Sequence, residues 1–281
     1  MANIFSGLEA FGLNNLAGID IYDEKEKETE RKASIEEKPA FSEEDTIFDK
    51  TFTCPVCDKE FKSKMVKSGK VKLLNLDADL RPVYQYMDPL KYDAIVCPHC
   101  GFAALNRFFN YVTSTQSALI KANISASFKG LKETGGIFTY DDAITRHKLA
   151  LINSIVKKSK TSERAYTCLK LAWILRGKAE TLPKDTPNYK QQMEALEQEE
   201  LDLISKAYVG FEDAFGKETF PMCGMDESTM TLLMAELARK SGRLDDASRW
   251  VSKVLISREA NERIKQKARD IKELIKDSKS V

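Results

Sequence analysis

Two pairs of cysteines carry the most specific chemistry in this sequence. Cys54 and Cys57 form one C-x-x-C motif, and Cys97 and Cys100 form a second, with residues 58 to 96 between them. Four thiolates in two such pairs can surround one ion tetrahedrally, and Zn²⁺ suits that arrangement. We therefore predict one structural zinc ion per chain, held by these four residues.

The residues beside the cysteines are typical of tight metal-binding turns. Pro55 and Pro98 fix φ within the two turns. Gly101 follows the second motif, at a position where such a turn often needs a positive φ. Rubredoxin-type iron uses similar turns and is one alternative. A disulfide or a redox-active C-x-x-C is another, but the sequence around the motifs lacks the thioredoxin-like βαβ pattern.

The sequence offers little support for catalysis. It has only two histidines, of which His99 lies inside the second motif and His147 lies between Arg146 and Lys148, where we expect a solvated side chain. No Gly-rich phosphate loop, G-x-S-x-G or H-E-x-x-H motif occurs. A four-cysteine site also leaves no open coordination position for water. We therefore expect a protein that is not an enzyme.

The remaining reactive groups have structural explanations. Three carboxylate pairs are expected near helix starts, where the helix dipole favours them, or on polar helix faces. We expect a buried core thiol at Cys168 and a loop thiol at Cys223. The carboxylate pairs are Asp141 with Asp142, Glu199 with Glu200, and Asp245 with Asp246.

The segment Lys59–Lys72 is rich in lysine. The alternating spacing of Lys62 and Lys64 places both on one face of a strand, and aromatic residues lie in the same module. Basic groups with aromatics can hold single-stranded nucleic acid, which makes Lys62, Lys64, Lys67 and Lys70 candidate contacts. A solvated lysine face that offsets the −2 charge of a Zn(Cys)₄ centre is the simpler interpretation. An acidic protein partner is a third.

Composition and charge narrow the function classes. The 281 residues carry a net charge of +1, so no overall attraction to nucleic acid or membrane is expected. The charge is uneven, at −7 over residues 1–50, +3 over 51–112 and +5 over 113–281. The start lacks a secretory signal pattern, and no apolar run approaches a membrane span. With Cys168 and Cys223 expected unpaired, these features predict a cytoplasmic protein.

The distribution of charged and apolar residues divides the chain into three segments. Residues 1–48 read as a flexible acidic segment with a short apolar motif at Ile4, Phe5, Leu8 and Phe11, which docks either on the protein itself or on a partner. Residues 49–112 form a small β-rich zinc-ribbon-like module, with strands near 50–53, 61–66 and 92–97. Residues 113–281 are helical. Helices are expected near 114–133, 140–158, 161–179, 188–214, 227–241, 244–256 and 258–277.

One helix pair carries a repeat signature. Ala235 and Ala247 are twelve residues apart, with Gly242 in the turn between their helices. Small residues at this spacing let two helices approach closely and are typical of tetratricopeptide repeats. The last helix has an apolar stripe and polar remaining faces, which suits a capping helix. The predicted fold is mainly α, a tetratricopeptide-like helical repeat domain preceded by the β-rich zinc-ribbon-like module.

The chain resembles the uncharacterised bacterial domain-of-unknown-function family 2225 over roughly residues 48–260. The resemblance rests on the Cys54–Cys57 motif, the stretch Pro89–Ala103 and the helix pair Met234–Leu255. It implies a zinc-ribbon-like start joined to a tetratricopeptide-like body, and it implies no established reaction.

These observations together predict a non-enzymatic, cytoplasmic zinc-binding adaptor that holds a protein or peptide in the groove of its helical repeats. The alternative is a zinc-ribbon protein that binds nucleic acid through the Lys59–Lys72 segment.

Overall fold

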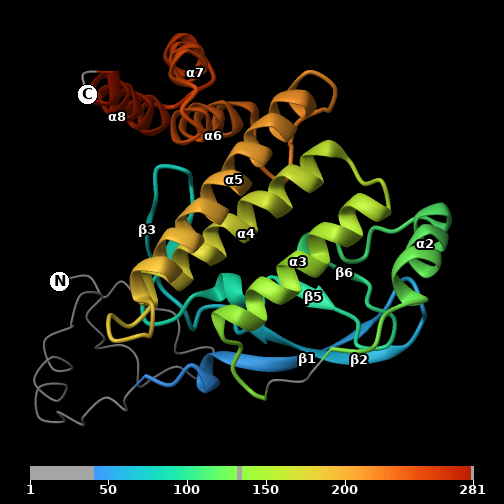
Figure 1. Ribbon diagram of the computed structural model, residues 1–281. Helices are drawn as coiled ribbons and strands as arrows, with labels where there is room; N and C mark the ends of the chain where they lie inside the picture. Colours follow the sequence, from blue (N-terminus) through green and yellow to red (C-terminus); the bar gives the residue numbers. More distant parts are fainter. Residues whose placement is uncertain (1–40, 132–134, 280–281) are drawn as a thin grey trace, which may run out of the picture. The chain divides into compact units, whose positions relative to one another are not determined.

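This computed structural model describes residues 41–131 and 135–279, and within them the strands precede the α-helices along the chain (Figure 1). The strands are β1 (Ile47–Thr53), β2 (Glu60–Val66), β3 (Leu73–Leu76), β4 (Pro82–Tyr84), β5 (Ala94–Val96) and β6 (Ala103–Leu105). The helices are α2 (Ser114–Ile120), α3 (Tyr140–Val156), α4 (Thr161–Thr181), α5 (Tyr189–Phe215), α6 (Glu227–Lys240), α7 (Leu244–Ile256) and α8 (Glu262–Lys279). This order confirms a mainly α fold with a small β-rich start. The apolar motif at Ile4–Phe11 lies outside the described residues.

The strands form three separate antiparallel hairpins, β1–β2, β3–β4 and β5–β6. In the first hairpin Phe52 pairs with Phe61, and the two rings stack with centroids 5.9 Å apart. The predicted strands near 50–53 and 61–66 are therefore present, and β1 begins three residues earlier. The strand predicted at 92–97 is shorter. Residues Pro89–Tyr92 form a 3₁₀ turn because Asp88 caps it, accepting a hydrogen bond from the N–H of Leu90 at 2.9 Å.

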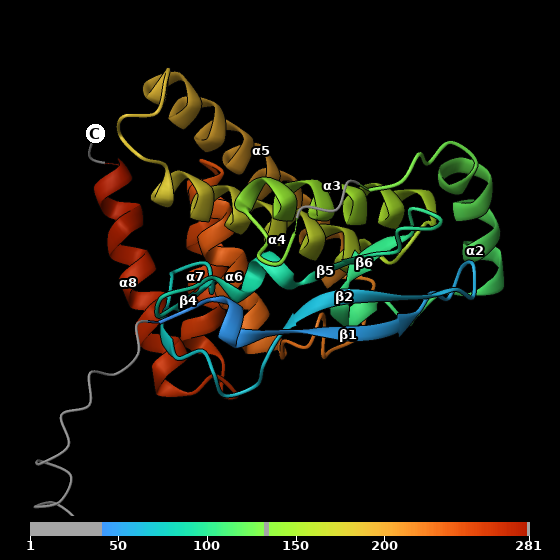
Figure 2. The same cartoon turned by 90° about the horizontal axis from the view of Figure 1, so that it is seen from below.

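The β5–β6 hairpin joins the β-rich part to the helices. Every residue of both strands is buried, which explains their continuous apolar sequences. One face packs with the cysteines through Ile95 and Ala104. The other face packs against Ala150 of α3 and consists of Ala94, Val96, Ala103 and Leu105. Figure 2 shows α3 lying over this hairpin.

Helices α3, α4 and α5 lie side by side with α4 in the middle (Figure 1). The central helix has a continuous buried stretch from Thr167 to Leu175, in which most residues are apolar or small. Close approach depends on a small residue on α5, because a Cβ at Gly210 would lie 2.9 Å from the Cβ of Ala165 on α4. The core of the helical part is therefore a tightly packed layer, without space for a larger residue at this crossing.

The α6–α7 pair forms where the repeat signature predicts it. Gly242 has φ +73°, which ends α6 as a left-handed residue, and α7 begins two residues later. Ala235 and Ala247 are fully buried between the helices. The close approach that these small residues predict is present. Tetratricopeptide-like repetition of the whole helical domain stays a prediction.

Two helix boundaries differ from the expectation by four residues or more. The helix predicted at 114–133 is shorter, since α2 passes into a π-helical turn at Lys121–Ser125 and Phe128 then packs against Gly101. The helix predicted from 258 begins at Glu262. Asn261 accepts a hydrogen bond from the N–H of Ile264 at 3.0 Å and so acts as its N-cap. Side-chain capping and a tertiary contact set these ends, and neither is visible in the apolar periodicity.

The turn between β3 and β4 is anchored in the helical part. Asp79 is fully buried there, accepting a hydrogen bond from Arg176 of α4 at 3.1 Å and pairing with Lys240 of α6 at 3.2 Å. Burial alone would raise the pKa of Asp79, but these two cations outweigh it and lower the pKa to about 2. Arg176 also pairs with Glu200 at 2.7 Å. Glu200 therefore belongs to a buried ion network, and its predicted solvation is wrong.

Within the described ranges, none of the helices combines the length and the apolar content that crossing a membrane requires.

Candidate metal centre

Each cysteine motif forms the turn of a β-hairpin. In the first turn the N–H of Cys54 donates to the carbonyl of Lys59 at 3.0 Å. In the second turn the N–H of Cys97 donates to the carbonyl of Phe102 at 2.8 Å. The two turns therefore share one backbone pattern, which fixes both cysteines of each motif relative to their strands.

A residue with positive φ closes each turn. It is Gly101 in the second turn, with φ +73°, as the sequence predicts. A Cβ at this glycine would lie 2.6 Å from the Phe128 ring, so glycine is required for space as well as for backbone conformation. The corresponding residue of the first turn is Asp58, with φ +59°. Asp58 is exposed, and aspartate tolerates this region better than most residues.

The four thiols converge on one point. The sulfurs of Cys54 and Cys100 are 3.6 Å apart, those of Cys57 and Cys97 are 3.7 Å apart, and all four lie within 4.8 Å of one another. A tetrahedral zinc with Zn–S bonds of about 2.3 Å separates its sulfurs by about 3.8 Å. A disulfide requires about 2.05 Å, and all four cysteines are free. The spacing fits one tetrahedral metal ion and does not fit a disulfide.

The short contacts run between the motifs, so one ion would connect the two hairpins. Three of the four cysteines are buried and Cys57 is half-buried. The apolar residues that enclose them are Phe52, Val56, Phe61, Ile95, Phe102, Phe109 and Ile120. Four thiolates would fill a tetrahedral coordination shell and leave no open position for water.

Thiols this close influence one another strongly. The contact with Cys100 raises the pKa of the Cys54 thiol and lowers that of Cys97. A bound divalent cation would favour the thiolate at every ligand, because the thiolate is the form that binds metal. Within the described part of the chain, these cysteines are the one set of three or more candidate ligands close enough to share an ion. His99 contacts the carbonyl of Glu60 at 3.2 Å and lies outside this set.

A buried asparagine connects the second turn to the helices. Asn153 of α3 is fully buried and donates to the carbonyls of Gly101 at 3.0 Å and Leu149 at 2.9 Å. Sequence reasoning missed this residue. The available signal was a polar amide among the apolar residues of the α3 face that includes Leu149 and Ala150.

The structure corrects the prediction for His147. Its side chain is fully buried, and its Nδ1 lies 2.7 Å from the carbonyl of Ala143, to which it must donate a hydrogen bond. Burial lowers the pKa of His147 to about 4, so the neutral ring is the native form. The Arg146–Lys148 context suggested a charged face, but those neighbours point in other directions around the helix.

The other predicted groups behave as expected, with one qualification. Cys168 is a buried core thiol, and the pairs at Asp141 and Asp245 lie in the first turns of α3 and α7. Cys223 lies in a loop but is partly buried, where its thiol donates to the carbonyl of Ser162 at 3.4 Å. Burial raises the pKa of Cys223 to about 12, which disfavours the reactive thiolate.

The candidate nucleic-acid lysines do not share one environment. Lys62 and Lys64 share one face of β2, as predicted, and Lys64 pairs with Asp49 at 2.9 Å. Lys67 donates to the backbone carbonyl of Asp45 at 3.0 Å. Lys70 lies in the exposed turn after the strand. The structure thus separates a pair on the hairpin face from two residues with other surroundings.

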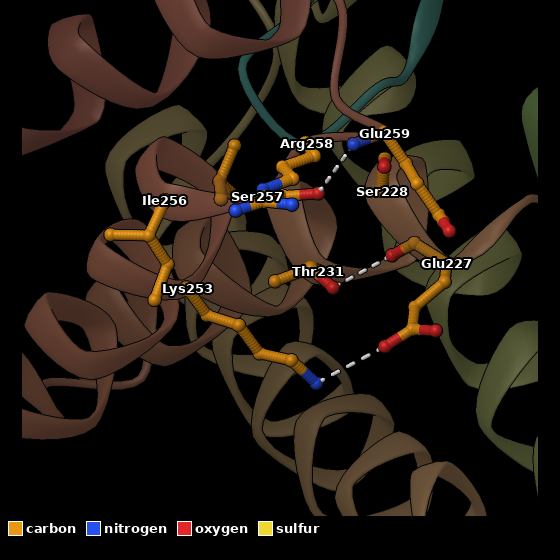
Figure 3. A pocket seen from close by; sticks show the side chains of 9 residues that line it. Glu227, Ser228, Thr231, Lys253, Ile256, Ser257, Arg258 and Glu259 are labelled. Atoms are coloured by element: carbon orange, nitrogen blue, oxygen red, sulfur yellow. Dashed lines mark hydrogen bonds and ion pairs between the residues drawn. The ribbon is translucent and has the colours of Figure 1, made fainter.

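A hollow of about 350 Å³ lies between the start of α6 and the end of α7 (Figure 3). Lys253 pairs with Glu227 across it at 3.3 Å, and the hydroxyl of Thr231 donates to the carbonyl of Glu227 at 2.7 Å. Ile256 borders the hollow and is 81% exposed. The lining also includes Arg258 and Glu259, so charged side chains of both signs surround the hollow.

The fold and the site define a mainly helical protein whose small β-rich start carries a four-cysteine cluster able to hold a metal ion. The chain belongs to the family described as "Uncharacterized protein conserved in bacteria (DUF2225)", which matches residues 47–275. The match includes both cysteine motifs and nearly all of the helices. No curated protein and no solved structure matches the chain.

Proposed function

We propose that this protein is a non-enzymatic, cytoplasmic scaffold in which one zinc ion stabilises the β-rich part and the helical part binds a protein or peptide. Zinc is favoured over iron because it suits a closed, structural four-thiolate site. The ion would hold two hairpins together, and β5–β6 packs directly on α3. Its role is therefore to stabilise the surface that the helices use.

The observation that carries the binding proposal is the exposure of Ile256 beside the hollow between α6 and α7. Ile256 has the largest exposed fraction of the exposed large apolar side chains in the described part of the chain. Lys253 and Glu227 provide a charge of each sign next to it. An apolar pocket rim with paired charges suits a peptide that inserts an apolar side chain and makes polar contacts around it.

The test begins with the tagged, zinc-loaded full-length chain and a native lysate treated with nuclease. A captured protein is identified and purified, and its Kd is then measured by calorimetry. We expect Ile256→Glu to weaken binding by about tenfold or more, because it places a charge at an apolar contact. Ile256 is so exposed that this change should leave folding intact.

Val209→Glu is the matched control, because Val209 is also an exposed apolar residue but lies on α5. It should leave the Kd unchanged. Equal binding by wild type and both variants would exclude the α6–α7 hollow as the interface. Proteins captured from an untreated lysate but lost from the nuclease-treated one would favour the nucleic-acid alternative.

A further inference from the structure

We propose that a basic pocket between the β1–β2 hairpin and α3 binds a phosphate group. The pocket encloses about 320 Å³ and lies on the opposite face of the hairpin from the cysteine cluster. Its lining is Asp49, Lys62, Ser63, Lys64, Gly135, Gly136, Phe138 and Arg146. This inference is separate from the proposed protein-binding hollow at α6–α7.

Three cations meet in this pocket from two elements. Lys62 and Lys64 point to the same face of β2 because successive side chains of a strand alternate, while Phe61 points to the cysteine side. Arg146 comes from α3, 82 residues further along the chain than Lys64. Asp49 is the one carboxylate in the lining, so the pocket has a formal excess of two positive charges.

Two contacts hold the cations in position before a ligand arrives. The guanidinium of Arg146 lies over the ring of Phe138, 4.0 Å from its centroid, which fixes the plane of its donors. Asp49 holds the ammonium of Lys64 at 2.9 Å. Lys62 is exposed and can adjust to the ligand. A partly fixed set of donors loses less conformational entropy on binding than three free side chains would.

Gly135 and Gly136 line the remaining side of the pocket, and the space beside their backbone is unfilled. A Cβ built at Gly135 or Gly136 meets no atom within 4 Å, so packing does not require glycine at either position. Gly135 has φ +84°, which does favour glycine. Two adjacent glycines without side chains let an anion approach the peptide groups closely, as phosphate-binding loops do.

Phosphate suits these donors better than a single carboxylate does. Its oxygens point in several directions and it carries more charge, so it can contact a planar guanidinium and separate ammonium groups at once. The phosphate could belong to a nucleic-acid backbone or to a small phosphorylated molecule, which share this chemistry. Of the lysines in the Lys59–Lys72 segment, Lys62 and Lys64 line the pocket. These two are therefore the ones expected to contact the phosphate.

The proposal is tested by calorimetry on the zinc-loaded full-length chain, with pyrophosphate, a single-stranded oligonucleotide and citrate as probes. We expect Lys62→Gln and Arg146→Gln each to weaken pyrophosphate binding about tenfold, the effect of losing one charge-assisted contact. Lys70→Gln is the matched control outside the pocket and should bind like wild type. Lys62 is exposed, so its variant tests the site even if Arg146→Gln impairs folding.

The probes separate the sources of the phosphate. Much tighter binding of the oligonucleotide than of pyrophosphate, weakened by Lys62→Gln, would identify a nucleic-acid backbone as the ligand. Comparable binding of the two would identify an isolated phosphate group. Citrate binding as tight as pyrophosphate, equal loss in Lys70→Gln, or no binding of any phosphate probe at low salt would each overturn the proposal.

Discussion

Asn153 of α3 donates a 3.0 Å hydrogen bond to the carbonyl of Gly101, the residue that closes the second cysteine turn. This bond is fully buried and connects residues 52 positions apart. It joins the candidate metal centre to the helical part directly. A structural change at the metal centre would therefore be transmitted to α3, against which the β5–β6 hairpin also packs.

Asn153→Ala should lower the free energy of unfolding by about 1–3 kcal/mol, because it leaves the buried carbonyl of Gly101 without this donor. It should also speed metal release to a chelator. The measurement is urea denaturation together with a colorimetric chelator assay. Asn123→Ala removes an exposed bond to the carbonyl of Leu119 and serves as the control. Equal losses in the two variants would contradict a special role for the Asn153 bond.

Gly101→Ala should destabilise the centre more than Gly69→Ala does. Both glycines have positive φ, which costs alanine about 1–2 kcal/mol. Gly69 has open space around it, whereas a Cβ at Gly101 would collide with Phe128. We expect reduced metal retention, measured after dialysis, only in the Gly101 variant. Asp58→Gly should retain the metal, since glycine accepts the same conformation. Metal loss in Gly69→Ala as well would indicate a general folding defect.

Asp79→Asn should cost about 3 kcal/mol, because it leaves Arg176 and Lys240 facing a neutral group in a buried site. The change in free energy of unfolding is measured by denaturation at pH 7. Asp213→Asn disrupts an exposed pair with Lys217 and should cost much less. A loss no greater than that of the Asp213 variant would show that the β3–β4 turn does not depend on this network.

His147 makes stability depend on pH. Its pKa of about 4 in the folded protein lies below its usual 6.5, so the unfolded chain takes up a proton that the folded chain excludes. Stability is fully present above pH 6.5 and falls as the pH drops toward 4. Between pH 7.5 and 5 the expected loss from this group is about 2 kcal/mol.

His147→Leu should remove that part of the pH dependence, measured by denaturation at both pH values in excess zinc. Proton uptake by the cysteines is common to wild type and variant. The difference between the two proteins therefore gives the contribution of His147 alone. His99→Gln is the control, since His99 is exposed. An unchanged pH dependence in the Leu variant would contradict the buried neutral state.

Local signals predicted most of the fold and the convergence of the four cysteines. The spacing of the four cysteines and Gly101 was sufficient because each motif is a short turn with fixed backbone requirements. The helices from α3 to α7 followed from apolar periodicity. The burial of Asn153 and Asp79 was not predictable, since these residues contact partners 52 and 161 positions away in the sequence. The burial of His147 was not predictable either, since Asp93 and Lys170, whose charges act on it, lie on other segments. Neighbouring residues in the sequence, such as the charges beside His147, say little about such contacts.

The most direct test of the metal centre is the metal content of the purified protein, measured by mass spectrometry after extensive dialysis. The account predicts one zinc per chain, a colourless protein, and loss of the ion in Cys97→Ser but not in Cys168→Ser or Cys223→Ser. A chain that folds with the same thermal stability while holding no metal, with four freely reactive thiols at the centre, would contradict it.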